Sequence, residues 1–427
     1  MKYVTSDSFP KTGSKDSKST PFSPNMINIL FVDDEPNILD GLRRMLRGLR
    51  HEWNMSFAGS GIEALALLEE RLIDVIVSDM KMPGMDGAEF LQKVSERFPH
   101  VVRIILSGFS ENEVNIKSVG TAHQYLSKPC DPELLKSTVS RVCALRDLLS
   151  DPALCRLVSQ LPSIPSLPTL YSELVAELEK EDSSLRNVAE IVRKDIGMTI
   201  KILQMVNSAF FGLRRQISDP RSAVEFLGMD TISSLTLGLG VISQFEHLSS
   251  GAFFAELWAH SLAVGVAANK IAMLEDREVG SDAFTAGLLH DVGRVILAAN
   301  LPTQFRSVCD MVKLDRVSLI EAEKAVFGAT HADVGAYLLG LWGLPSPVVE
   351  AVAFHHSPMD VQADNFTALT AVHAAIGIQS HLAYNEPDWS EPELDKAYLG
   401  TVGVTDRIPL WLELCTYRNA EAMQTAY

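Results

Sequence analysis

Residues 73–79, IDVIVSD, decide the fold of the N-terminal part of the chain. Apart from Asp74 the segment is apolar up to Ser78, and it ends in the carboxylate of Asp79. An almost continuous apolar run of this length is typical of a parallel strand that helices cover on both faces. We therefore expect residues 73–78 to form a central strand of a parallel sheet, with Asp79 at its carboxyl end.

The segments around this strand alternate between strand and helix patterns. Short apolar runs predict four further strands, at residues 27–32, 53–58, 102–106 and 122–126. Helical periodicity predicts helices at residues 37–49, 61–70, 88–97, 111–119 and 131–149. Five β–α units in about 120 residues predict an α/β domain with a flavodoxin-like, doubly wound parallel sheet of five strands.

Polar residues stand where the predicted strands end. Asp33 and Asp34 follow the first strand and Asp79 follows the third, and these ends meet at one edge of a parallel sheet. Three carboxylates in one crevice repel one another, and Mg²⁺, which prefers oxygen ligands, suits them as a counter-ion. A carboxylate beside Mg²⁺ can attack a phosphoryl group, whose oxygens a hydroxyl from Ser107 and an ammonium from Lys128 can bind. The pattern predicts a phosphoryl-transfer site.

The motifs at these strand ends resemble those of the receiver domains of two-component response regulators. They are FVDDEP (31–36), SDMKMPGMDG (78–87), ILSGFS (105–110) and YLSKP (125–129). The resemblance covers residues 27–149 and implies that Asp79 accepts a phosphoryl group from a sensor histidine kinase. It also implies that Ser107 and Lys128 bind the phosphoryl oxygens.

The same resemblance implies a metal site and a switch. Asp34, Asp79 and the backbone carbonyl of Lys81 would hold Mg²⁺, with Asp33 completing the acidic pocket. Tyr125 occupies the aromatic switch position, where the ring moves inward when Ser107 is drawn to the phosphate. Lys81 departs from the Asn, Met or Arg of many receivers, which places an extra cation near the phosphoryl group.

Beyond Asp151 the strand pattern ends. Prolines punctuate residues 161–168, and the chain from Thr169 to about Leu382 is nearly all amphipathic helix. Residues 1–26 are polar and are expected to form a flexible leader, and residues 386–427 a C-terminal tail that is helical in part. The second domain, all-α, is therefore expected within residues 154–385.

The helical part resembles the HDOD domain, a relative of the HD phosphohydrolases. The matching motifs include LPSIPSLP (161–168), AEIVRKDIGMTIKILQMVNSAFFG (189–212), AGLLHDVGR (286–294), THADVGAYLLGLWGLP (330–345) and FHHSP (354–358). The resemblance implies a helical output domain that acts through protein interaction, and in HD hydrolases histidines and a His-Asp pair bind the metal.

Six residues of the helical part are candidate ligands of a second metal ion, because imidazole and carboxylate together suit a transition metal. They are His260, His290, Asp291, His331, His355 and His356. Three departures weaken the resemblance to an active enzyme. Ile376 stands where the HD pattern needs a late Asp, no Gly-Tyr-Pro follows His355-His356, and Arg294 replaces a lysine.

Three interpretations of these histidines follow. In the first the site is vestigial and each ring is hydrogen-bonded in the core or at a helix end. In the second it binds a metal or nucleotide for regulation. In the third it is a working metal-dependent phosphohydrolase or cyclic-dinucleotide phosphodiesterase. The three departures favour the first interpretation, so we do not expect an enzyme.

Composition indicates which classes of partner and which cellular compartment to expect. A formal net charge of −17 makes a large nucleic-acid interface a poor expectation, since phosphate binding needs a basic face. No apolar run is long enough to cross a membrane, and the start of the chain lacks the apolar region of a secretory signal. The five cysteines are scattered and outside CxxC spacing, which predicts reduced thiols and a cytoplasmic location.

The sequence as a whole predicts a phosphorelay response regulator. Phosphorylation of Asp79 would control the HDOD domain, which would in turn engage a protein partner that the sequence does not name. Direct binding to nucleic acid or to a membrane is not expected.

Overall fold

The structure is a computed structural model of the chain. It describes residues 26–108, 122–128, 130–147, 149, 151–161, 168–178, 180, 182–207, 216–238, 251–361, 365–382 and 394–424. The predicted flexible leader, except Met26, and the helix predicted at residues 111–119 lie outside these ranges.

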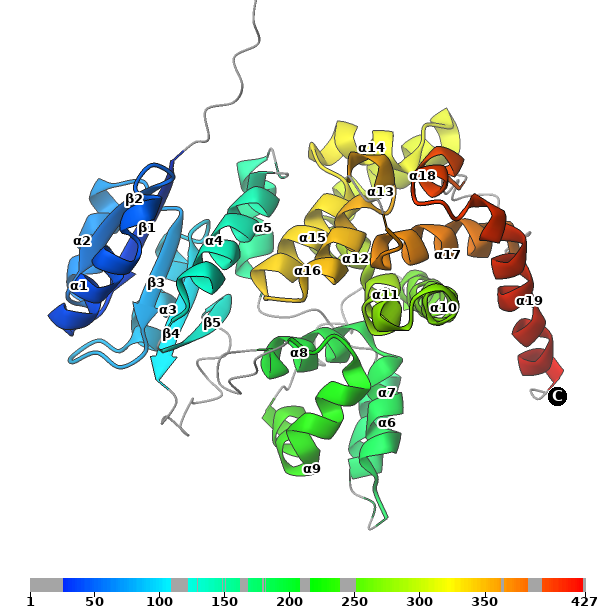
Figure 1. Cartoon of the computed structure of the whole chain (residues 1–427), viewed down its shortest axis with the longest axis horizontal. Coiled ribbons are helices and arrows are strands. Elements are labelled where there is room, and N and C mark those ends of the chain that lie inside the picture. The colour runs from blue at the N-terminus through cyan, green and yellow to red at the C-terminus, as the bar shows by residue number, and fades with distance from the viewer. Residues whose placement is uncertain are drawn as a thin grey trace, which may run out of the picture.

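The N-terminal domain is built on a parallel sheet of five strands. They are β1 (Ile27–Val32), β2 (Trp53–Ala58), β3 (Val75–Asp79), β4 (Val102–Gly108) and β5 (Gln124–Lys128). Their order is β2-β1-β3-β4-β5, which is the flavodoxin-like order. The prediction of a doubly wound, five-stranded parallel sheet is confirmed, and β5 forms one edge of it (Figure 1).

Helices cover both faces of the sheet (Figure 1). They are α1 (Pro36–Met45), the short η1 (Arg47–Leu49), α2 (Gly61–Glu70), α3 (Gly87–Arg97) and α4 (Pro132–Asp147). Side-chain caps begin two of them, because Ser60 accepts a hydrogen bond from the backbone of Glu63 and Asp86 one from Glu89. The central strand β3 is buried from Val75 to Ser78, as its apolar sequence predicted.

The rest of the described chain is helical. A first group consists of α5 (Pro152–Gln160), α6 (Pro168–Leu178), α7 (Leu185–Arg193), α8 (Ile196–Val206) and α9 (Pro220–Gly238). A second group consists of α10 (Gly251–Glu275), η5 (Arg277–Val279), α11 (Gly280–Leu289), α12 (Val292–Asn300), α13 (Pro302–Asp310), η6 (Met311–Asp315), α14 (Leu319–Phe327), α15 (His331–Leu341), α16 (Ser346–Phe354), η7 (Pro358–Asp360) and α17 (Ala368–Leu382). The expected succession of α/β and all-α parts is thus confirmed.

The C-terminal segment packs against the helical part. It contains α18 (Lys396–Thr401), η8 (Thr405–Arg407) and α19 (Ile408–Gln424). Trp411 of α19 is fully buried and donates a hydrogen bond of 2.8 Å to Glu275 of α10, and the Tyr398 hydroxyl lies 2.9 Å from that of Thr370 in α17. Residues 394–424 of the segment expected to be a partly helical tail therefore pack as a cover on the helical domain.

Apolar clusters show how the parts are joined. Helices α6 to α9 have a core of their own, which includes Val188, Leu203 and Val224. One face of the receiver-like sheet forms a separate cluster with α2 and α3. The other face belongs to one continuous cluster with helices α10 to α19. None of the helices in the described ranges has both the length and the apolar character that a bilayer span requires.

Candidate functional sites

The first candidate site lies at the carboxyl ends of the strands. Val32 of β1 is level with Ser78 of β3, so Asp33 and Asp79 come side by side just beyond them. Lys128 pairs with Gly108 at the end of β5, two residues further along the strand direction than the level of Asp79. A lysine side chain is long enough to reach back across that distance, and the register thus aims Lys128 at the carboxylates.

Lys128 bridges two carboxylates. Its ammonium lies 2.7 Å from Asp33 and is also hydrogen-bonded and ion-paired with Asp79. The backbone N–H of Lys81 donates to the other oxygen of Asp79 over 2.8 Å, and the N–H of Glu35 donates to Asp33 over 2.9 Å. Backbone N–H groups therefore hold the carboxylates of Asp33 and Asp79, and the ammonium of Lys128 links the two carboxylates.

Burial and hydrogen bonding shift the pKa values of Asp79 and Lys128. Burial raises the pKa of Asp79 above its usual value, although the hydrogen bond with Lys128 works against this shift. Burial also opposes the charge on Lys128, but its hydrogen bonds with Asp33 and Asp79 outweigh that effect and raise its pKa. The lysine is therefore fully charged at neutral pH and holds the pair of acids together.

The structure places most of the predicted receiver residues at this edge. Asp33, Asp79, Lys81 and Lys128 are in contact, and Asp34 is half-buried immediately after Asp33. Ser107 and Tyr125 lie on β4 and β5, but their side chains, like all of Pro129, fall outside the described part of the structure. Their predicted roles remain predictions.

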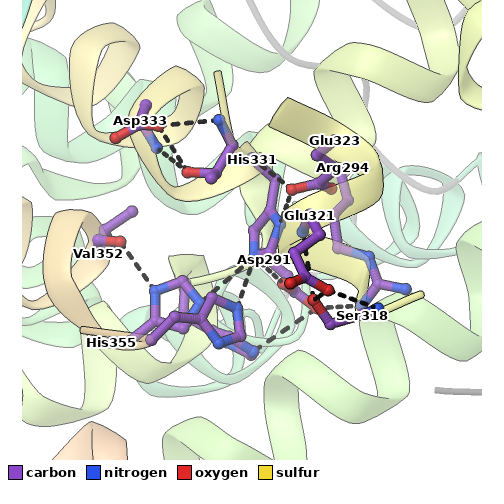
Figure 2. Close-up of polar contacts among 12 residues, drawn as sticks. Asp291, Arg294, Ser318, Glu321, Glu323, His331, Asp333, Val352 and His355 are labelled. Carbon is purple, nitrogen blue, oxygen red and sulfur yellow. Dashed lines mark hydrogen bonds and ion pairs between the residues drawn. The ribbon is translucent and has the colours of Figure 1, made fainter. Parts of the chain in front are cut away.

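The second candidate site is a buried cluster that joins residues far apart in sequence (Figure 2). All six predicted residues contribute: His260 from α10, His290 and Asp291 from the junction of α11 and α12, His331 from the start of α15, and His355 and His356 from the end of α16. Their potential ligand atoms form two sets, each spanning no more than 4.8 Å, namely His331-His355-His356 and His260-His290-Asp291.

The two sets touch through His331. Its Nε2 atom lies 3.2 Å from Asp291 Oδ1, 3.3 Å from His355 Nε2 and 3.0 Å from His356 Nε2. The rings of His290 and His355 meet edge to face with centroids 5.3 Å apart. The six residues therefore make one cluster around His331.

Contacts outside the cluster fix how the rings point. Nδ1 of His290 lies 2.8 Å from the Gly287 carbonyl. Nδ1 of His355 lies 2.8 Å from the Val352 carbonyl, as Figure 2 shows. A carbonyl only accepts, so in both rings Nδ1 is the donor of this hydrogen bond, and Nε2 points into the cluster. Nδ1 of His331 similarly faces the Glu323 carboxylate at 2.7 Å. This outer support is the kind that orients metal-binding histidines.

Charges inside the cluster are compensated. Asp291 forms a buried ion pair with Arg294 at 2.7 Å. Burial opposes the charge of Asp291, but Arg294 and the neighbouring histidines hold its pKa well below its usual value. Burial likewise opposes charge on His331, but Glu323 raises its pKa, whereas burial lowers the pKa of His355. Arg294 donates to Oδ2 of Asp291, and Oδ1 of Asp291 faces His331.

Sequence reasoning missed two supporting residues. Glu323 on α14 is fully buried and accepts hydrogen bonds from both the backbone and the ring of His331. His373 on α17 lies with Nδ1 2.9 Å from the carbonyl of His355. A carboxylate on the apolar face of the amphipathic segment LIEAEKAVF (319–327) was the available signal for Glu323. Ile376, at the position where the HD pattern needs Asp, is buried in the apolar core.

Two family models match the chain. The model described as the response regulator receiver domain matches residues 29–140, and the HDOD domain model matches residues 164–358. The chain therefore contains a receiver domain followed by an HDOD domain. The receiver domain holds the Asp33-Asp79-Lys128 site, and the HDOD domain holds the histidine cluster.

Individual relatives are similar to part of this chain. An uncharacterized protein of Treponema pallidum (strain Nichols) is 25% identical over 52% of this chain and 44% of its own length. The hydrogenase transcriptional regulatory protein HoxA of Cupriavidus necator is 39% identical over 30% of this chain and 27% of its own. The chain thus spans less than half the length of these curated relatives.

Two solved structures are similar to part of this chain. The MmoQ response regulator from Methylococcus capsulatus str. Bath is 24% identical over 58% of this chain and 98% of that chain, with a TM-score of 0.46. The signal receiver domain of an HD domain-containing protein from Pseudomonas fluorescens Pf-5 is 30% identical over 27% of this chain and 93% of that chain, with a TM-score of 0.26.

Proposed function

We propose that this protein is a phosphorelay response regulator in which a sensor histidine kinase phosphorylates Asp79. The observation that carries the proposal is the contact of Lys128 with both Asp33 and Asp79 at the strand ends. An ammonium in this place neutralises the acceptor before transfer and can bind a phosphoryl oxygen after it. The exposed edge of Asp79 leaves a path for the donor, since its side chain is 12% exposed.

A hard cation belongs to this proposal. Asp33, Asp34, Asp79 and the backbone carbonyl of Lys81 supply only oxygen ligands, which is the donor set that Mg²⁺ prefers. When bound, Mg²⁺ would stabilise the charge that develops on the phosphoryl oxygens. Ser107 would donate to a second oxygen, and Tyr125 would report the change, as the receiver resemblance implies.

The output of the protein is proposed to be a protein interaction of the HDOD domain. The acidic chain and the ion pair that engages Asp291 support this role over catalysis and over binding to nucleic acid. A cytoplasmic location, where a sensor kinase presents its phosphohistidine, is part of the same proposal. So are the domain limits 27–149 for the receiver, 154–385 for the HDOD domain and 386–427 for the C-terminal segment.

Phosphorylation of the purified chain tests the proposal. Acetyl phosphate with Mg²⁺ should add one phosphoryl group to the wild type and to Asp40→Asn, whose carboxylate is exposed on α1, but none to Asp79→Asn. Intact-mass measurement reads the result. Labelling of Asp79→Asn to the wild-type level would place the acceptor elsewhere.

A second candidate function is cation binding in the HDOD domain. The observation that favours it is the hydrogen bond from Nδ1 of both His290 and His355 to a backbone carbonyl, which turns the Nε2 atoms of both rings into the cluster beside Asp291. A borderline transition metal such as Zn²⁺ suits imidazole with one carboxylate. Bound metal could serve regulation or, through an activated water, phosphodiester hydrolysis.

Metal analysis separates these possibilities. The wild type and His51→Gln, a control at an exposed position of the receiver, should retain Zn²⁺ after gel filtration, and His355→Gln should lose most of it. Cyclic and linear dinucleotides then test turnover. Metal without turnover supports a regulatory site, and a metal-free wild type after incubation with Zn²⁺ supports the vestigial interpretation.

A further inference from the structure

Helix α15 connects the histidine cluster to the receiver domain. His331, the first residue of α15, is at the centre of the cluster. The C-terminal half of α15 faces the receiver. Ten of its eleven residues are buried, so the helix is enclosed on nearly all sides. In Figure 1, α4 and α5 lie between the receiver sheet and helices α15 and α16.

The first contact with the receiver comes from β5. The side-chain amide of Gln124, which is 7% exposed, donates to the backbone carbonyl of Gly340 over 2.7 Å. Gln124 and Lys128 are the two ends of the same five-residue strand, about 13 Å apart at the usual rise of a strand. One short strand therefore carries both the lysine of the phosphoryl site and a buried contact with the HDOD domain.

A second contact runs through α5. Arg103 and His123 both donate to the carbonyl of Ser159, over 3.2 and 3.0 Å. The hydroxyl of Ser159 then lies 2.9 Å from the hydroxyl of Tyr337 on α15. All four residues are at most 5% exposed, so this is a buried polar path from β4 and the residue before β5 to the middle of α15.

A third contact is made by α4. Arg141 donates to the hydroxyl of Ser346 over 2.9 Å, just beyond the C-terminal end of α15. Leu145 lies directly over Gly340, where a Cβ atom would come within 2.2 Å of the leucine Cδ1. Leu145 of α4 thus packs directly against α15 at Gly340.

We propose that α15 couples the two sites, so that phosphorylation of Asp79 loosens the docked receiver and shifts His331 within the histidine cluster. The inference rests on the proposed function in taking Asp79 as the phosphoacceptor. In the docked arrangement Lys128 pairs with two carboxylates. A phosphoryl group on Asp79 draws Lys128 to a new partner, and β5 carries that change to Gln124.

The N-terminal end of α15, in the histidine cluster, is packed so tightly that a shift of the helix changes its contacts. Gly293 packs so closely on the carbonyl of His331 that a Cβ atom there would lie 1.9 Å from it. His331 and Gly340 are nine residue steps apart along the helix, about 14 Å at the usual rise, and a helix of this length moves as a unit. A movement of the Gly340 end thus alters the contact of His331 with Asp291. By linkage, an occupied cluster affects the receiver reciprocally.

Amide hydrogen exchange on the full chain tests the coupling. Beryllofluoride with Mg²⁺ serves as the phosphoryl mimic, and ¹⁹F resonance confirms that it is bound. We expect the amides of residues 337–341 to exchange about tenfold faster when it is bound, because docking no longer protects them. Asp79→Asn should neither bind the mimic nor change its exchange.

Interface variants separate coupling from a general effect. Gln124→Ala and, independently, Arg141→Ala should exchange quickly at residues 337–341 without the mimic and change little when it binds. Ser137→Ala, exposed on α4, should behave like the wild type. Unchanged exchange of α15 in a wild type that has bound the mimic overturns the coupling. Absence of the ¹⁹F signal from the wild type overturns the proposed receiver function instead.

Discussion

The receiver site and the histidine cluster are both sets of charged and polar side chains, but they differ in access. Lys128 is 22% exposed and Asp79 12%, whereas Asp291, Arg294 and His331 are at most 6% exposed. A site that accepts a group from another protein needs an open edge. A buried cluster must instead balance its own charges, because uncompensated charge in the interior costs several kcal/mol. The same residue types therefore have different consequences for stability.

The largest expected effect is on a buried ion pair. Asp291→Asn removes the carboxylate that Arg294 pairs with and should lower the opening free energy of α12 by about 3 kcal/mol or more. Asp79→Asn, at the open edge, should change the opening free energy of β3 by less than about 1 kcal/mol. Native-state hydrogen exchange measures both. Equal losses at the two sites would contradict the distinction drawn between them.

Zn²⁺ and Mg²⁺ should stabilise different sites, the histidine cluster and the receiver site respectively. Zn²⁺ at about 100 times its Kd should stabilise α12 and α15 by about 2.7 kcal/mol, because it binds the folded cluster alone. Mg²⁺, which prefers oxygen ligands, should act on the receiver and leave α15 unaffected in the absence of a phosphoryl group. His355→Gln should remove the response to Zn²⁺ and retain that to Mg²⁺. Equal responses to Zn²⁺ in His355→Gln and the wild type would point to binding elsewhere.

A pH change should act on the contact between the two domains. Burial, followed by the charge of Arg103, lowers the pKa of His123 well below 6.5, and burial lowers that of Arg103 only to about 10. Folded His123 thus stays neutral while the unfolded chain takes up a proton, and the free energy of unfolding falls as pH drops below about 6.5. The loss reaches at most about 1.4 kcal/mol per pH unit for this residue.

The variant His123→Gln isolates that contribution. Glutamine can accept from the backbone of Arg103 and donate to the carbonyl of Ser159 without titrating. Urea unfolding between pH 7 and pH 5.5 should therefore show a weaker pH dependence in the variant. Because other buried histidines, including His355 and His373, have lowered pKa values too, only the difference between the two curves is assigned to His123. If the wild type and His123→Gln showed the same pH dependence of the free energy of unfolding, His123 would not contribute to it.

The receiver fold was predictable because its signals are local. The strands 27–32 and 53–58 match β1 and β2, since apolar runs between turn residues leave little choice. The strands predicted at 73–78, 102–106 and 122–126 end one or two residues beyond the predicted ends, at Asp79, Gly108 and Lys128. In each case the strand continues through the polar residues of the site, because the parallel ladder continues past the last apolar side chain.

The sites were predictable to different degrees. Motifs placed Asp33, Asp79 and Lys128 at one edge, and strand register brings them together. The six cluster residues were also named in advance, but Glu323 and the ion pair of Arg294 depend on how α12, α14 and α15 pack. The docking of Gln124 on Gly340 joins positions 216 residues apart and has no sequence pattern of its own.

The smallest expected effect tests the start of α15, where the cluster and the coupling meet. Thr330 caps this helix in a capping box with Asp333, in which its hydroxyl accepts from the Asp333 backbone at 3.2 Å and donates to the carboxylate at 2.7 Å. Thr330→Ala should cost about 1 kcal/mol of α15 stability by hydrogen exchange. Ser60→Ala, the matching cap of α2 in the receiver, should cost a similar amount but leave the Zn²⁺ response intact. Because Thr330 precedes His331, its loss should also weaken Zn²⁺ binding, and an unaffected Zn²⁺ affinity would show that the cluster does not depend on how the helix begins.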